Sequence, residues 1–141
     1  MRLLQHINFQ NQRAIIRVDF NVPLNDNLEV TDKTRIEAAK PTIDYILSQG
    51  GSCVLLSHLG RPKGNDPRLS LKNIVSDVSQ ILGVPVEFSE TVVGAEAEAK
   101  ANALQPGQVL LMENLRYHEE ETAGDVSFSK QLAQLGTIYV N

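Results

Sequence analysis

Residues Ser52–Leu56, with the sequence SCVLL, form a short and almost uninterrupted apolar run. A run of this length and character predicts a strand buried on both faces, as in the parallel sheets of α/β proteins. Similar runs recur along the chain and predict four more strands: Arg13–Phe20 (RAIIRVDF), Val84–Phe88, Gln108–Met112 (QVLLM) and a last one that opens at Thr137–Val140.

Helical patterns lie between these runs. Thr34–Ala39 predicts a short helical turn that Pro41 breaks, and Pro41 then begins a helix that continues to Gln49. The other predicted helices are Leu71–Leu82 with Ser70 as its cap, Gly94–Ala103, and one capped by Asp125 or Ser127 that ends at Leu135. Repeated alternation of strand and helix predicts an α/β fold with a parallel sheet and helices on both faces.

Composition excludes several classes of protein. The 141 residues carry a net charge of −4, with nine Lys and Arg against seven Asp and Glu up to residue 70, and four against ten afterwards. No basic face dominates, so general nucleic-acid binding is not expected. No apolar run approaches the ~18 residues that span a bilayer. The single cysteine, Cys53, cannot form an internal disulfide, which suits a reducing cytoplasm.

Known catalytic motifs are also missing from the sequence. There is no G-x-x-x-x-G-K-[ST] loop, no G-x-G-x-x-G, no G-x-S-x-G elbow and no set of residues with metal-ligand spacing. Any chemistry must therefore come from a different arrangement.

Polar residues follow three of the predicted strands where each one ends. Asp19 and Asn21 follow the first strand, Ser57–Gly64 (SHLGRPKG) follows the second, and Glu113–His118 (ENLRYH) follows the fourth, while Arg35 lies just beyond the first loop. Carboxyl ends of parallel strands share one sheet edge, where ligands bind in open α/β folds. Arginines and histidines gathered there favour an anion, and Asp and Asn favour a hydroxyl, which together suit a small phosphorylated carboxylic acid.

Each of these residues taken alone has an ordinary structural explanation. Asp19 is typical of a turn or helix cap, His58 of a loop histidine bonded to backbone, and Arg61 and Lys63 of solvated loop charges, while Arg17 suits an ion pair. Their occurrence at one edge of one sheet is what favours a site.

Four stretches resemble the phosphoglycerate kinase family, and they occur in that family's order: RVDFNVPL (Arg17–Leu24), TDKTRIEAAKPTI (Thr31–Ile43), SHLGRPKG (Ser57–Gly64) and ENLRYH (Glu113–His118). Tyr117 departs mildly from the family pattern, which commonly has Phe. The family pattern also continues beyond Val140 and Asn141 into a further substrate arginine, so the sequence is expected to be a fragment.

The resemblance implies a glycolytic enzyme that moves a phosphoryl group reversibly between 1,3-bisphosphoglycerate with ADP and 3-phosphoglycerate with ATP. It implies a three-layer α/β/α sandwich with a mostly parallel sheet, of whose six strands about five are present here. Residues 1–141 would be an incomplete amino-terminal, 3-phosphoglycerate-binding domain. MgATP or MgADP would bind a second domain outside this chain, so neither cofactor nor metal is expected here, and the fragment is expected to be inactive alone.

The resemblance also assigns roles residue by residue. Asp19 and Asn21, with Phe20 between them, would contact the hydroxyl and carboxylate of the glycerate. Arg35 would be the catalytic residue, meeting the reacting carboxyl group and the transferred phosphoryl. The phosphate end would be held by His58, Arg61 and Arg116, with the backbone of the other two predicted substrate-binding residues, Leu59 and Gly60, nearby.

The complete parent is expected to be a cytoplasmic monomer that binds neither nucleic acid nor membrane, whereas the fragment is expected to self-associate through an exposed sheet edge. Two other functions stay open. One is a non-catalytic anion-binding module that uses the same loops. The other is a receiver-type domain phosphorylated on Asp19, which fits less well because no adjacent acidic pair follows the first strand and no lysine closes the fifth.

Overall fold

A computed structural model of the chain describes residues 7–60, 67–115 and 126–140, with only the backbone described for 126–129. Its centre is a five-stranded sheet in the order β3-β4-β2-β1-β5, in which every pair of neighbours is parallel. The strands are β1 (Arg13–Arg17), β2 (Ser52–Leu56), β3 (Val86–Ser89), β4 (Val109–Met112) and β5 (Ile138–Val140). The predicted α/β fold is confirmed.

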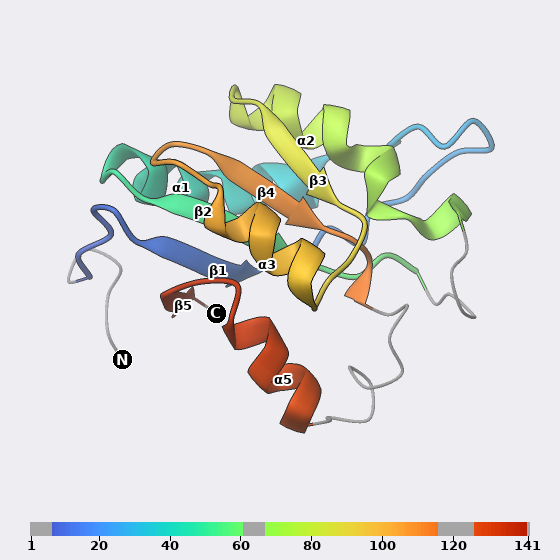
Figure 1. Cartoon of the computed structure of the whole chain (residues 1–141). Helices are drawn as coiled ribbons and strands as arrows, with labels where there is room; N and C mark the ends of the chain where they lie inside the picture. Colours follow the sequence, from blue (N-terminus) through green and yellow to red (C-terminus); the bar gives the residue numbers. More distant parts are fainter. Residues whose placement is uncertain (1–6, 61–66, 116–125, 141) are drawn as a thin grey trace.

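Helices cover both faces of this sheet and make three layers (Figure 1). The helices α1 (Thr34–Ser48) and α2 (Val75–Leu82) pack on one face, and α3 (Ala95–Asn102) and α5 (Val126–Ala133) on the other. Two short 3-10 helices, η2 (Pro67–Leu69) and η3 (Leu71–Ile74), precede α2.

Alternate residues of the strands supply two separate cores. In β2, Cys53 and Leu55 belong to the cluster under α1 and α2, whereas Val54 and Leu56 belong to the cluster under α3 and α5. All five β2 residues are buried, because side chains of a strand alternate between faces and both faces here are covered.

The predicted break at Pro41 is wrong, because α1 is one helix that runs through it. Proline has no N–H to donate to the carbonyl of Glu37, four residues earlier. Both residues are exposed, so water can satisfy that carbonyl. Ile36 on one side of Pro41, and Ile43 and Ile46 on the other, are fully buried and hold both halves of the helix on the sheet.

Other elements differ from prediction at their ends. The first strand stops at Arg17 rather than Phe20, because the backbone N of Phe20 bonds to the Ser57 side chain and leaves the ladder. The helix expected from Leu71 begins as η3 and becomes α-helical only at Val75. The predicted cap is confirmed, since Ser70 Oγ accepts from the backbone N of Lys72. Asp125, one of the two caps predicted for the last helix, lies outside the described residues, and Ser127, the other, lies inside α5.

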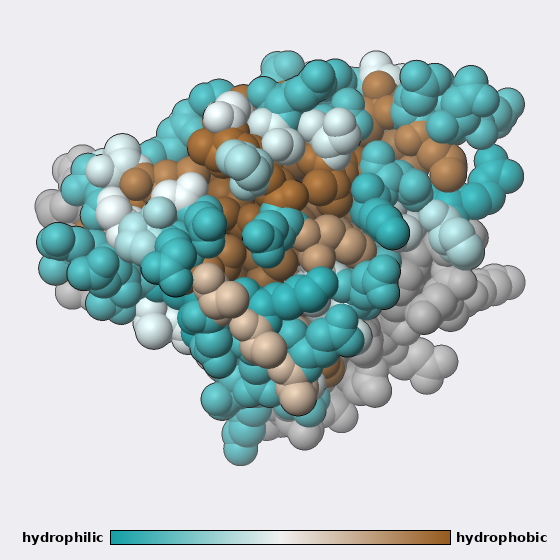
Figure 2. Space-filling view, turned by 45° about the horizontal axis from the view of Figure 1, so that its top comes forward, coloured by the Kyte–Doolittle hydropathy of each residue, from teal (hydrophilic) through white to brown (hydrophobic). Residues whose placement is uncertain are grey.

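The two edges of the sheet are β3 and β5. Figure 2 shows hydrophobic residues in the middle of the visible face, with hydrophilic residues around them. Val86 and Phe88 of β3 are half-buried against the larger core, while Tyr139 of β5 is 53% exposed.

Candidate functional site

Three strands end side by side at the carboxyl edge of the sheet, as the sequence predicts, since β4, β2 and β1 are neighbours. The buried residue Ser57, directly after β2, ties the three strand ends together. Its Oγ accepts from the backbone N of Phe20 (2.9 Å), and its carbonyl oxygen accepts from the backbone N of Leu115 (3.0 Å). The predicted convergence of these loops is therefore present.

Asn21 connects the loop after β1 to the loop after β2. Its Oδ1 accepts a hydrogen bond of 2.8 Å from the backbone N of Gly60. Gly60 has a left-handed φ of +61°, and a Cβ built there would lie 2.8 Å from Leu69 Cδ2, so a side chain would be both strained and crowded. With Oδ1 occupied in this way, the Nδ2 group of Asn21 is left to donate to a ligand.

Arg35 lies on the first turn of α1 and reaches back to the end of β1. Its Nη1 lies 3.0 Å from Asp19 Oδ1 and 3.1 Å from the carbonyl oxygen of Asn21. The side chains of Arg35 and Asp19 are 52% and 62% exposed, so this ion pair faces solvent. Both contacts use Nη1, and a guanidinium has five N–H donors, so others remain for an anion.

The start of α1, which carries Arg35, is fixed by Asp32. Asp32 Oδ1 accepts from Thr34 Oγ1 (2.6 Å) and from the backbone N of Thr34 (2.9 Å). These two hydrogen bonds favour the charged carboxylate and hold the pKa of Asp32 below its ordinary value.

The other predicted ligands differ in accessibility. His58 is half-buried, whereas Phe20 is fully buried and Leu59 is 2% exposed, so neither Phe20 nor Leu59 presents its side chain to a ligand. Arg61 and Arg116 lie outside the described residues, and their roles stay predictions.

Besides Ser57, two residues that hold the site loops are missing from the predicted site. Asn114 Nδ2 donates to the carbonyl oxygens of Leu59 and Leu69, both at 2.8 Å. The Glu113 carboxylate accepts from Ser70 Oγ (2.6 Å) and from the backbone N of Leu71 (2.9 Å). Their position after β4 marks them as loop residues, but nothing in the sequence indicates which distant loop they bind.

A cavity of about 240 Å³ lies beside Asn21 and Gly60. Its walls come from the loop after β1, which an antiparallel bridge between Leu24 and Val30 closes, and from the loop after β2. It is lined by Asn21, Val22, Leu24, Asn25, Leu28, Leu59, Gly60, Arg68 and Leu69.

Other kinds of site find no support in the part of the chain that is described. Among those residues, no group of three or more His, Cys, Asp or Glu is arranged to hold a metal ion. No helix there is long and apolar enough to cross a membrane. Burial raises the pKa of the Cys53 thiol to about 12, so it is not a ready nucleophile.

The fold and these contacts define an open, parallel α/β sheet whose carboxyl edge pairs an arginine with polar loop residues. Folds of this class bind their ligands at that edge. The family model for phosphoglycerate kinase matches residues 4–141, and the chain belongs to that family.

Curated relatives and solved structures agree with this assignment. The phosphoglycerate kinase of Chlorobium phaeovibrioides is 49% identical over 141 residues, which cover 99% of this chain and 36% of the relative. The cytosolic phosphoglycerate kinase of Nicotiana tabacum is 44% identical over 138 residues, covering 98% and 34%. The crystal structure of phosphoglycerate kinase from Pyrococcus horikoshii superposes with a TM-score of 0.89 at 30% identity, covering 100% of this chain and 36% of that one. The chain thus spans about a third of the length of these relatives.

Proposed function

We propose that this chain is the 3-phosphoglycerate-binding part of a phosphoglycerate kinase, an incomplete amino-terminal domain whose nucleotide partner domain lies elsewhere in the complete protein. The observation that carries the proposal is the cluster of Arg35, Asp19 and Asn21, which is bonded to the Gly60 loop at the carboxyl edge of the sheet. The complete protein would transfer a phosphoryl group reversibly between 1,3-bisphosphoglycerate with ADP and 3-phosphoglycerate with ATP.

The roles of individual residues follow from their chemistry. Asp19 accepts from the hydroxyl of the glycerate, and the Nδ2 group of Asn21 donates to its hydroxyl or carboxylate. His58, Arg61 and Arg116 hold the phosphate, with the Leu59 and Gly60 backbone beside it.

Arg35 is the proposed catalytic residue. In the direction that consumes ATP, an oxygen of the substrate carboxylate attacks the γ-phosphorus, the bond to the leaving ADP oxygen breaks, and an acyl phosphate forms. Negative charge is spread over the transferred group as this happens, and a positioned guanidinium stabilises it. Mg²⁺ and nucleotide enter as the substrate MgATP or MgADP, bound by the rest of the complete protein.

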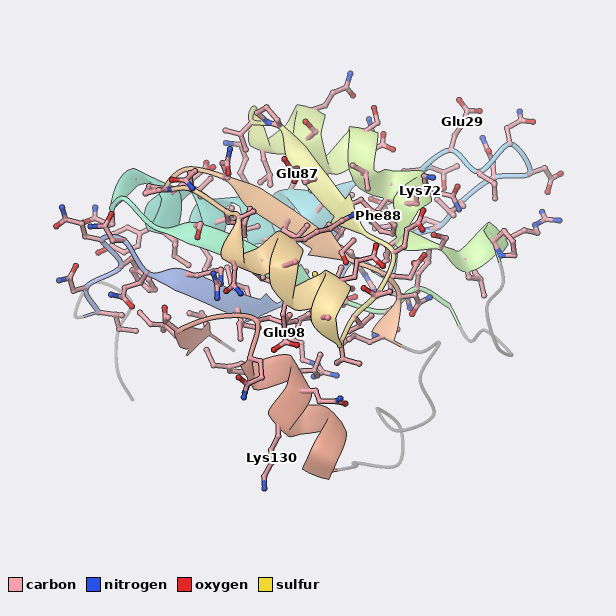
Figure 3. The ribbon with its side chains drawn as sticks, viewed as in Figure 1. Glu29, Lys72, Glu87, Phe88, Glu98 and Lys130 are labelled. Carbon is pink, nitrogen blue, oxygen red and sulfur yellow. The ribbon has the colours of Figure 1, made fainter. Side chains whose placement is uncertain are left out.

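Calorimetric titration of 3-phosphoglycerate into the 141-residue chain tests the binding half of the proposal. We expect saturable binding of one ligand per chain, weakened by Asp19→Ala and unchanged by Glu87→Gln on the distant strand β3 (Figure 3). Absence of binding by the folded chain would overturn it.

The catalytic half is tested in the complete protein. If Arg35 acts on the transition state, Arg35→Ala lowers kcat by about 100-fold or more and changes KM little. Equal effects on substrate affinity and turnover would make Arg35 a binding residue.

We expect the 141 residues alone to show no turnover in a coupled kinase assay, since phosphoryl transfer needs both substrates enclosed.

We further propose that the 141-residue chain self-associates through β5, because this strand lies at the edge of the described sheet and carries the exposed Tyr139, and edge strands are prone to pair with another chain. Light scattering tests this self-association, and a monomer at high concentration would contradict it.

A cytoplasmic location is proposed for the complete parent protein, since the Nicotiana tabacum relative is named as cytosolic.

A further inference from the structure

Asn114 is a fully buried polar residue, two positions after the end of β4. Only three other polar residues in the described part of the chain are buried, and all three are serines. A buried amide is costly unless it is hydrogen-bonded, so the partners of Asn114 indicate what the residue is for.

The Nδ2 group of Asn114 has two acceptors that lie apart in the chain. Asn114 Nδ2 donates to the carbonyl oxygen of Leu59, just after β2, and to that of Leu69, at the end of η2. One amide group therefore connects two points that are ten residues apart in the chain. The side chain of Leu69 also packs against Gly60, the residue directly after Leu59.

The bond to Leu59 has a particular consequence for Asn21. The carbonyl of Leu59 and the N–H of Gly60 belong to the same planar peptide unit. Asn114 holds the oxygen of this unit at 2.8 Å, and Asn21 Oδ1 holds its nitrogen at 2.8 Å. The two asparagines thus bind opposite sides of one peptide plane. Asn114 sets the orientation of this plane, and the N–H of Gly60 then sets the orientation of the Asn21 amide that binds it.

We infer that Asn114 is a positioning residue for phosphoglycerate binding, which acts through the Leu59–Gly60 peptide to orient the Nδ2 group of Asn21 toward the ligand. Asn114 does not touch the ligand, because its side chain is buried. The inference rests on the proposed function, since the ligand is the one proposed above.

Glu113 supports the same loop from its far end. Its carboxylate binds Ser70 and Leu71, just beyond the second attachment point of Asn114, and also accepts from the backbone N of Asn114 (2.7 Å). Without Asn114, Glu113 would still hold the start of η3, but the Leu59–Gly60 peptide would lose the hydrogen bond on its oxygen side and keep only the one to Asn21.

The test compares Asn114→Ala with Ser89→Ala in the 141-residue chain. Ser89 is also fully buried and donates to one carbonyl oxygen, that of Thr91 at 2.6 Å, but it lies at the end of β3. At a temperature where urea unfolding shows both variants folded, we expect the Kd for 3-phosphoglycerate to rise about tenfold in Asn114→Ala, as for one lost hydrogen bond, and to change less than about twofold in Ser89→Ala. An unchanged Kd in folded Asn114→Ala would overturn the inference.

A double-mutant cycle separates positioning from general stability. If Asn114 acts through Asn21, then Asn114→Ala added to Asn21→Ala raises the Kd by less than about twofold further. A full additional tenfold loss would show an effect that does not pass through Asn21, and would contradict the inference.

Amide hydrogen exchange tests the positioning role without ligand, and so separates it from the proposed function. In the isosteric variant Asn114→Asp, which loses both donors, we expect exchange of the Gly60 N–H to rise at least about tenfold relative to that of Val18, which bonds to the carbonyl of Leu56. Lack of 3-phosphoglycerate binding by the unsubstituted chain would refute the proposed function alone. Unchanged protection of Gly60 would refute the role of Asn114.

Discussion

Arg35 Nη1 lies 3.0 Å from Asp19 Oδ1, which joins the first turn of α1 to the end of β1 by an ion pair between two residues that the sequence placed in one site. Both side chains are more than half exposed, so solvent screens their attraction. The pair therefore orients the guanidinium at the edge of the sheet and contributes little to the stability of the fold.

Arg35→Ala is accordingly expected to lower the free energy of unfolding by less than about 1 kcal/mol, measured by urea denaturation. Lys40→Ala is the matched control, because Lys40 forms an ion pair of 2.6 Å with Asp44 on the same helix at similar exposure. A loss of several kcal/mol for Arg35→Ala alone would show that the residue supports the fold, and its effect on turnover could not then be assigned to catalysis.

Glu113 is expected to matter far more for stability. Its carboxylate accepts three hydrogen bonds, from Ser70 Oγ, Leu71 N and Asn114 N. Glu113→Ala removes all three and leaves backbone donors without their partner, so we expect a loss of about 2–4 kcal/mol in urea denaturation. Glu87→Ala on the exposed side of β3 is the control, with an expected change within about 0.5 kcal/mol. Equal effects would mean that water replaces the carboxylate at no cost.

The layered fold could be predicted from the sequence because strand burial leaves a local signature. The apolar residues of SCVLL are consecutive, and the structure divides them between two cores, Cys53 and Leu55 on one face and Val54 and Leu56 on the other. The continuous α1 could not be predicted, because the tolerance of Pro41 depends on how Ile36 and Ile43 pack against the sheet.

The candidate site was predictable only in part, for a similar reason. Asp19, Asn21 and Arg35 lie close together as the sequence suggests, since strand ends in a parallel sheet share an edge. Ser57 and Asn114 were missed because their partners are distant: Ser57 and Phe20 are 37 positions apart in the chain, and Asn114 and Leu59 are 55 apart. Polar residues after a strand are common, and only the folded chain identifies the loop that each one holds.

Gly136 is a position where the backbone leaves no room for a side chain. A Cβ there would lie 2.7 Å from the carbonyl oxygen of Arg13 and 2.6 Å from Ile15 Cγ1. Gly136→Ala should therefore force β1 and the connection from α5 to β5 apart, with an expected loss of about 1–3 kcal/mol or more.

Gly83→Ala is the natural comparison for this prediction. Gly83 ends α2 with φ of +73° and has nothing within 4 Å of a built Cβ, so only backbone strain of about 1 kcal/mol is expected. Thermal denaturation of both variants shows which substitution lowers the stability more. A smaller loss for Gly136→Ala than for Gly83→Ala would show that the strands move apart easily.

Cys53 is expected to be inert in the folded chain. Burial in β2 raises the pKa of its thiol to about 12, so at pH 8 almost none is the reactive thiolate. Its reaction with a coloured disulfide reagent should follow unfolding as urea is added. The thiol introduced by Ser48→Cys at an exposed position serves as the control and should react at once. Equally fast labelling of Cys53 without urea would mean that β2 opens readily.

Asp32, just before α1, makes the stability of the folded chain depend on pH. Hydrogen bonds from Thr34 hold the pKa of Asp32 in the folded state below its ordinary value of 3.8. A carboxyl group whose pKa is lower when folded binds fewer protons in the folded state, so its contribution to stability is complete above its unfolded pKa. That contribution to stability is lost as the pH falls through the pKa that Asp32 has in the folded state. The difference in Tm between the unsubstituted chain and Asp32→Ala should therefore stay constant from pH 7 to about pH 5 and shrink below about pH 4.

Asp26→Ala, at the exposed turn of the loop after β1, controls for the general effect of removing one negative charge. A Tm difference for Asp32→Ala that grows as the pH falls would have the opposite sign to the one expected for a depressed pKa. It would mean that the hydrogen bonds from Thr34 favour the neutral carboxyl group, and that the first turn of α1, with Arg35 on it, is held by something other than the Asp32 carboxylate.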